Sequence, residues 1–234
     1  MTDYSEGWTR WGDMIRYSPA PFHRRRLILA LAREVDFASA MDVGCGNATL
    51  LLALRRLRPG AALVGIDIAD TVIAEDRAAH ADVEFHQLDI GASALPTQCD
   101  LVICSEVLEH VRDWKQALHH LRRMCSAHLI LTVPAGPVFP IDRLMGHERH
   151  FTLEVLSPAL REAGFEIQRA WRWGFPFHTL YKRLINLSPE ASVRRFSSGK
   201  YGTTERAVSR LLTWLFYLNS RRAGAQLVLR ARAA

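Results

Sequence analysis

The chain has 234 residues, 49% hydrophobic and 23% charged, which is enough apolar material for one sizeable core or at most two small domains. This composition excludes fibrous, collagenous and wholly disordered chains. The formal net charge of +6 is uneven, because residues 171–234 hold 12 Lys and Arg against 2 Asp and Glu, whereas residues 1–170 hold 18 against 22. A basic C-terminal quarter therefore follows a mildly acidic body, and an acidic partner would meet the protein there.

Cysteine usage and the N-terminus indicate the compartment. The four cysteines are scattered without a Cys-x-x-Cys pair, which favours a reducing environment and argues against structural zinc. The first ten residues are polar and contain Asp3 and Glu6, so we expect neither a signal nor a transit peptide. No run of about 18 apolar residues is present. We therefore expect a cytoplasmic protein.

The first predicted element is a flap over residues 1–39 that contains four aromatic residues and ends in a helix over about 22–34; the four are Trp8, Trp11, Tyr17 and Phe22. Residues 40–171 then alternate short apolar runs with amphipathic ones, which is typical of βαβ units around a largely parallel sheet. Strands are predicted at 40–43, 62–66, 83–88, 101–104, 129–133 and 165–171, and helices at 49–58, 71–79, 113–125 and 153–163.

Residues 174–224 are too long for a plain loop, so we expect a basic helical insertion or cap over about 172–224. It carries aromatic residues from Trp173 to Tyr181, a break at Ser188-Pro189 and an amphipathic helix over about 204–219. That helix can pack inward, which we favour, or contact a partner or an anionic membrane. A last strand at 225–229 returns to the core, within a final segment 225–234.

The end of the first strand has the pattern of a ligand-binding turn. It reads Asp42-Val43-Gly44-Cys45-Gly46, where glycines let the backbone approach a ligand and a helix N-terminus follows. Thr49 stands in place of the third glycine of the dinucleotide fingerprint, which disfavours a pyrophosphate cofactor. Asp67, 23 residues after Gly44, and Asp89 end the next two strands. They could bind an adenosine ribose and adenine, or simply terminate their strands.

These motifs, with Cys99-Asp100-Leu101-Val102-Ile103-Cys104-Ser105-Glu106-Val107-Leu108-Glu109-His110-Val111 and a later His147-Glu148-Arg149-His150-Phe151-Thr152, occur in one order. Over residues 40–171 the chain resembles class I S-adenosylmethionine-dependent methyltransferases, in the small-molecule branch that includes ubiquinone-pathway enzymes. The resemblance implies an α/β, Rossmann-like, doubly wound seven-stranded sheet whose last strand is antiparallel, with an N-terminal helical flap and a helical insertion before that strand.

The resemblance also implies S-adenosyl-L-methionine as the cofactor. Asp42 would meet its ammonium group, while Gly44, Cys45 and Gly46 would cradle its methionine part. Asp67 would hold the ribose and Asp89 the adenine amino group. Ile68 and Ile90 would sandwich the adenine, and Ser105 would offer its backbone. One arginine of Arg24, Arg25 and Arg26 could reach the cofactor carboxylate, or all three could form a solvated helix face.

Methyl transfer is an in-line displacement that depends chiefly on proximity and on exclusion of water. For a hydroxyl acceptor a general base helps, and His110 or His147 is our candidate, although His110 could instead bond to backbone. The alternative is a divalent cation held by Glu106, Glu109 and His110 with His147 or His150. Small-RNA 3′-end methyltransferases and some ubiquinone-type relatives use a similar segment. We expect no metal here.

We predict a methyltransferase for a small, hydrophobic acceptor, with oxygen favoured over nitrogen or carbon. The aromatic residues of the flap and of residues 173–181 would line an apolar acceptor pocket, or would simply form the core of the cap. Three other functions remain open: an RNA methyltransferase, a membrane-surface enzyme for a lipid-linked acceptor, and a non-catalytic cofactor-binding protein. No appended RNA-binding module is recognisable, so nucleic acid is not favoured. The pattern does not predict an oligomeric state.

Overall fold

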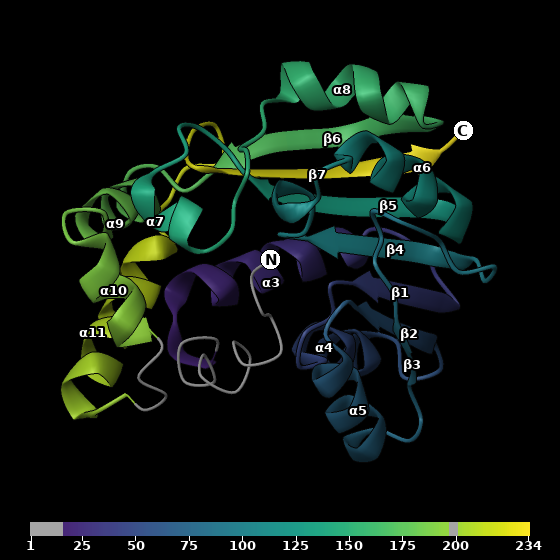
Figure 1. The fold of residues 1–234 in the computed structure, drawn as a ribbon, viewed down its shortest axis with the longest axis horizontal. Helices are drawn as coiled ribbons and strands as arrows, with labels where there is room; N and C mark the ends of the chain where they lie inside the picture. The colour runs from purple at the N-terminus through teal and green to yellow at the C-terminus, as the bar shows by residue number, and fades with distance from the viewer. Residues whose placement is uncertain (1–15, 197–200) are drawn as a thin grey trace.

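The sheet is the frame that positions the rest of the chain. The computed structural model describes residues 16–196 and 201–234. It contains a seven-stranded sheet in the order β3-β2-β1-β4-β5-β7-β6 (Figure 1). β7 pairs antiparallel with both β5 and β6, and the other pairings are parallel, so the predicted fold class is confirmed. The strands are β1 (Ser39–Val43), β2 (Ala62–Asp67), β3 (Glu84–Gln87), β4 (Cys99–Ser105), β5 (Cys125–Pro134), β6 (Phe165–Trp173) and β7 (Gln226–Ala233).

Helices cover both faces of this sheet, because its central strands are apolar on both sides. Along β4, Leu101 and Ile103 belong to one hydrophobic cluster, and Val102 and Cys104 belong to the other. The first cluster packs against α3 (Pro19–Ala32), α4 (Thr49–Leu57) and α5 (Asp70–Ala79). The second packs against α6 (Trp114–Met124) and α8 (Leu153–Glu162). The arrangement is that of a doubly wound sheet.

The residues between β6 and β7 fold as helices at one end of the sheet. They form α9 (Phe177–Ile185), α10 (Pro189–Phe196) and α11 (Thr203–Phe216), which lie beside α3 in Figure 1. We call these three helices the cap. The predicted break falls between α9 and α10, where a proline begins the second helix. Two short elements were not anticipated from the sequence, the 3-10 turn η1 (Leu108–His110) and α7 (Pro140–Leu144). None of the described helices is long and apolar enough to cross a membrane.

An aromatic cluster joins the cap to α3. Trp173 is 1% exposed and stacks on His23 and His178, with ring centroids 5.5 and 5.1 Å apart. Phe216 of α11 meets the Trp173 ring edge-on at 6.1 Å. The imidazole of His23 also bonds to the carbonyl oxygen of Thr213 at 2.9 Å. Buried rings therefore pack the cap on α3, and α3 and α11 share one hydrophobic core.

The return of the chain from the cap to β7 depends on Gly224. This residue has φ +144°, and a Cβ added there would lie 2.1 Å from the carbonyl oxygen of Trp173. Its own carbonyl oxygen accepts two hydrogen bonds from the Arg172 guanidinium, at 3.0 and 2.6 Å. The atoms that this Cβ would meet belong to the main chain of Trp173 and Gly174, so no flexible side chain can move aside to make room for it.

We predict that Gly224→Ala lowers the free energy of unfolding by about 2–4 kcal/mol, because the methyl group both overlaps backbone and requires an unfavourable φ. Urea denaturation measures the change. Gly60→Ala is the matched control, since a Cβ at Gly60 meets no atom within 4 Å. Equal stability of the two variants would contradict the prediction.

Candidate active site

A cavity of about 950 Å³ opens at the carboxyl ends of the central strands. β1, β2 and β4 run parallel, so the polar residues that end them meet at one edge of the sheet, where open α/β folds bind ligands. α3 closes one side of the cavity through Pro21, Arg24 and Arg25. The structure thus brings to one cavity all but one of the residues assigned to the cofactor: Asp42, Gly44, Cys45, Asp67, Ile68, Asp89, Ile90 and Ser105.

The turn after β1 forms the floor of the cavity, and it requires glycine. Gly44 has φ +77°, and a Cβ there would lie 2.4 Å from a methyl group of Val107. The backbone N–H groups of Gly44 and Cys45 both donate to the carbonyl oxygen of Ile66, at 2.7 and 2.9 Å. Gly46, the residue that does not line the cavity, has φ +51° and donates its N–H to Asp67 at 3.0 Å. The turn is therefore tied to the end of β2.

Two buried carboxyl groups stand beside this turn. Asp42 and Asp67 are 3% and 6% exposed. Burial raises the pKa of Asp42 well above its usual value, and the nearby charge of Asp67 raises it further. Burial also raises the pKa of Asp67, while hydrogen bonds from the backbone of Ala69 and Gly46 partly offset that effect. A cation or hydroxyl donors placed here would satisfy oxygens that water reaches poorly.

The far end of the cavity has an apolar slot with one polar edge. Ile90 is 4% exposed and Ile68 is 46% exposed, and both line the cavity. Asp89 is exposed, and its Oδ1 accepts the backbone N–H of Gly91 at 2.8 Å, which orients its carboxylate. His120 bonds to the carbonyl oxygen of Ile90 at 2.7 Å and so holds this wall in place. Two isoleucine side chains and one oriented carboxylate suit a flat, heteroaromatic group with a polar edge.

The three consecutive arginines of α3 have different surroundings. Arg24 donates to the Glu106 carboxylate at 3.1 Å, and it lines the cavity. Arg25 also lines the cavity, and burial lowers its pKa. The Arg26 guanidinium lies over the ring of Tyr217, 4.7 Å from its centroid, and does not line the cavity. Of the three, Arg25 is the best placed to meet an anionic part of a ligand.

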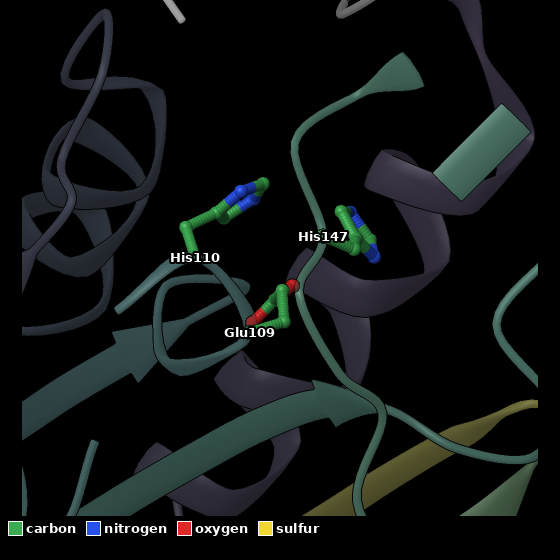
Figure 2. Close-up of side chains that lie close together, drawn as sticks. All are labelled: Glu109, His110 and His147. Carbon is green, nitrogen blue, oxygen red and sulfur yellow. The ribbon is translucent and has the colours of Figure 1, made fainter. Parts of the chain in front are cut away.

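Glu109, His110 and His147 form a cluster beside the cavity, shown in Figure 2. One potential ligand atom from each residue lies within 4.8 Å of the other two. Glu109 is fully buried, and neither carboxylate oxygen has a hydrogen-bond partner among the described residues. Burial, and then the charge of Glu106, raise the pKa of Glu109 well above its usual value. Because an unpaired buried carboxylate is costly, this group is suited to hold a proton or a cation.

The two histidines of the cluster are neutral bases. Nδ1 of His110 lies 3.1 Å from the carbonyl oxygen of Gly146, so Nδ1 carries the proton and Nε2 the lone pair. Burial lowers the pKa of His110. Burial, and then the nearby His110, lower the pKa of His147 to about 3. The bond from His110 to backbone, the alternative to a role in catalysis, is therefore present. It selects the tautomer that can accept a proton at Nε2.

A chain of polar contacts connects His147 to the cap. Nδ1 of His147 lies 3.2 Å from Nε2 of His150, which lies 3.4 Å from the Asp142 carboxylate. Asp142 also pairs with Lys182 of α9 at 3.1 Å. A second group of possible ligand atoms, from Asp142, His147 and His150, results from these contacts. The sequence contained no signal for Asp142 or Lys182, because they meet only through the packing of α7 against the cap.

The structure assembles a different ligand set from the alternative cation site of Glu106, Glu109 and His110 with His147 or His150. Glu106 has φ +58° and precedes η1, so the three residues do not share one face of an α-helical turn. Its carboxylate instead bonds to Arg24, to Gln226 at 2.7 Å and to Thr132 at 3.3 Å. His147, and not Glu106, lies beside Glu109 and His110, and His150 pairs with Asp142.

The expected aromatic acceptor pocket is absent from the described part of the chain. No Trp, Tyr or Phe lines the cavity. Trp173, Phe177 and Tyr181 pack into the core beneath the cap, and Phe22 meets Tyr217 edge-on at 6.4 Å. The rings are buried because the cap needs a core of its own where it meets α3. Trp8 and Trp11 lie outside the described residues.

Comparisons with known proteins agree with this geometry. Residues 41–128 match the profile of the methyltransferase domain family. The chain is 34% identical over 105 residues to the ubiquinone biosynthesis O-methyltransferase of Pseudomonas entomophila. This match covers 42% of this chain and only 41% of that protein. It is 30% identical over 172 residues to an uncharacterized methyltransferase of Mycobacterium tuberculosis, covering 71% of this chain and 86% of the relative.

A solved structure extends the likeness to the whole fold. N-methyltransferase NodS from Bradyrhizobium japonicum, in complex with S-adenosyl-L-homocysteine, superposes with a TM-score of 0.62 and 15% identity over 99% of this chain and 98% of that chain. At that identity the likeness concerns the fold alone. Together with the relative that is matched over most of its length, it shows that the chain belongs to the class I S-adenosylmethionine-dependent methyltransferases.

Proposed function

We propose that the chain transfers a methyl group from S-adenosylmethionine to an oxygen atom of a small, largely apolar acceptor. The observation that carries the proposal is that the buried carboxyl groups of Asp42 and Asp67 line the same cavity as His110 and His147, with the buried Glu109 beside the two histidines. The named activity of one relative, a ubiquinone biosynthesis O-methyltransferase, supports oxygen as the methylated atom. The chain spans less than half of that relative's length.

The cavity residues fit the cofactor in order along the strand ends. Asp67 binds the ribose hydroxyls with the lone pairs left by the N–H groups of Gly46 and Ala69. Asp42 meets the ammonium group, and Arg25 the carboxylate of the methionine part. Ile68 and Ile90 enclose the adenine, whose amino group faces Asp89. When bound, the cofactor supplies an electrophilic methyl group on sulfur.

On the acceptor side, the protein orients a hydroxyl group and takes its proton. His110 accepts that proton at Nε2, because its Nδ1 faces the Gly146 carbonyl oxygen. Glu109 is buried within 4.8 Å of the imidazole, and its ionised form would stabilise the imidazolium that forms. His147 lies 4.8 Å from His110 by ring centroids and closes the same side of the cavity.

The ribose assignment predicts that Asp67→Ala weakens S-adenosylmethionine binding about 100-fold, since two hydrogen bonds to a carboxylate are lost. Isothermal titration calorimetry measures the affinity. Asp67→Asn, which keeps the shape of the side chain, tests whether a loss comes from unfolding. Asp70→Ala, an exposed acid just after the same strand, is the control and should bind normally. Unchanged affinity in Asp67→Ala would show that the ribose lies elsewhere.

The base assignment predicts that His110→Gln lowers kcat by about 10²–10⁴-fold on a hydroxyl acceptor, with little change in S-adenosylmethionine affinity. Steady-state methylation of a panel of phenols, hydroxy acids and amines provides the rate. His80→Gln, at the end of α5 and away from the cavity, is the control. A panel on which amines react and hydroxyl groups do not would overturn oxygen as the acceptor atom.

One observation favours a second arrangement of the same cluster, in which a divalent cation assists the transfer. The partnerless carboxylate of Glu109, with the neutral imidazoles of His110 and His147, is a donor set suited to Zn²⁺, Fe²⁺ or Mn²⁺ rather than Mg²⁺. A bound cation would hold an acceptor hydroxyl and lower its pKa. In this arrangement, His110 ligates the cation instead of taking the proton.

The cation-assisted arrangement predicts that one Zn²⁺ or Mn²⁺ binds per chain and that Glu109→Gln weakens binding at least tenfold. Calorimetric titration of chelator-treated protein measures both. Glu148→Gln, on the neighbouring loop and paired with Arg149 at 2.7 Å, serves as the control. Full methyl transfer after exhaustive chelation, with no cation bound, would leave His110 as the base without a metal.

A further inference from the structure

Helix α11 presents apolar side chains on two sides. Its inner side packs against α3 and α9 through Leu212 and Phe216. Its outer side carries Val208, Leu211 and Trp214, which are 52%, 60% and 74% exposed. Leu218, in the turn after the helix, is 69% exposed. The spacing of Val208, Leu211 and Trp214 places these three on one side of the helix, and together with Leu218 we call them the α11 stripe.

A water-facing helix side in a soluble domain is normally polar, so the α11 stripe needs a reason. Within residues 16–196 and 201–234, no side chain covers it, since its members keep half or more of their surface accessible. Single exposed apolar residues are common, but three in register with a tryptophan among them mark an interaction surface. The stripe also lies outside the cavity.

Cations accompany the stripe. Arg210 of α11 is exposed, and so are Arg221 and Arg222, which follow in the turn toward β7. Arg183 of α9 is exposed as well. The surrounding sequence, residues 171–234, carries 12 Lys and Arg against 2 Asp and Glu. An apolar helix side with an exposed tryptophan, flanked by arginines, is the composition of a helix that lies in the plane of a membrane interface.

Charge decides between the possible occupants. A second copy of the chain on the same surface would form an isologous contact, which would bring this basic region against itself. Anionic lipid headgroups instead complement it, with each nearby Lys or Arg contributing about 1 kcal/mol.

We propose that α11 docks the protein on an anionic membrane surface, with the α11 stripe at the level of the headgroups and acyl chains and with Arg210 and Arg222 on the phosphates. The docking itself is independent of methyl transfer. α11 packs on α3, whose Arg24 and Arg25 line the cavity, so docking would hold the bilayer on the α3 side of the cavity. That consequence rests on the proposed function, and it suits an apolar acceptor taken from the membrane.

Cosedimentation with vesicles tests the docking. Wild-type protein is mixed with vesicles of equal phosphatidylglycerol and phosphatidylcholine, and with vesicles of phosphatidylcholine alone. We expect binding to the anionic vesicles that weakens with salt, and at least tenfold weaker binding to the neutral ones. Leu211→Ser with Trp214→Ser should weaken anionic binding at least tenfold. Arg210→Gln with Arg222→Gln should weaken it about 25-fold at low salt.

Controls separate docking from folding and from the proposed function. Val155→Ser removes an apolar side chain that is 50% exposed from α8 and should bind vesicles like the wild type. Calorimetric S-adenosylmethionine binding reports whether each variant is folded, and loss of that binding in all proteins would count against the proposed function only. Vesicle binding that the α11 substitutions leave unchanged would overturn the docking proposal. So would a dimer that these substitutions dissociate, or binding to an RNA oligonucleotide in place of vesicles.

Discussion

The Glu106 carboxylate joins parts of the chain that are far apart in sequence, and the site depends on it. It accepts hydrogen bonds from Arg24 of α3, Thr132 of β5 and Gln226 of β7. These contacts lie at the carboxyl edge of the sheet, where α3 closes the cavity and where the chain returns from the cap. A half-buried acid with three donors is well satisfied, whereas removal of one partner would leave a charge poorly solvated. The left-handed backbone at Glu106 also directs the chain into η1, which places His110 at the cavity and Glu109 beside His110.

Charge is separated across the molecule in a way that fits the two proposals. The cavity concentrates carboxyl groups that burial makes reluctant to ionise, and these are suited to a cationic cofactor and its hydroxyl groups. The cap concentrates arginines on its outer surface, where water screens them and an anionic surface can reach them. The two regions are linked through α3, which lines the cavity on one side and packs on α11 on the other. α3 therefore connects the cavity that we propose to hold the cofactor with the helix that we propose to dock on a surface.

The apolar periodicity located the strands and helices of residues 40–171 to within a few residues, because each of these elements is defined by its own burial pattern. The residues that we propose to hold the cofactor were named from motifs that resemble those of the family, and the structure brings all but Gly46 of them to one cavity. They sit at strand ends and tight turns, and the parallel topology brings such ends together whatever the details of packing. By contrast, the sequence pattern indicated aromatic walls for an acceptor pocket, whereas Trp173 and Phe216 form the core of the cap. Composition shows that rings will be buried but not which of two apolar environments will bury them.

The amino-acid sequence by itself determined the sheet, its strand-end carboxylates and the glycine turn at Gly44, since each follows from local periodicity or from a backbone angle that few residues adopt. Tertiary structure alone decided which groups act together. His147 joins Glu109 and His110, Lys182 joins Asp142, and Gln226 joins Glu106, each pair separated by dozens of residues. The outward side of α11 was decided in the same way, because its helical period contains two apolar sides and only packing on α3 selects the one that is buried. Side-chain contacts of this kind depend on how helices and loops pack at the sheet edge, and no local pattern encodes that packing.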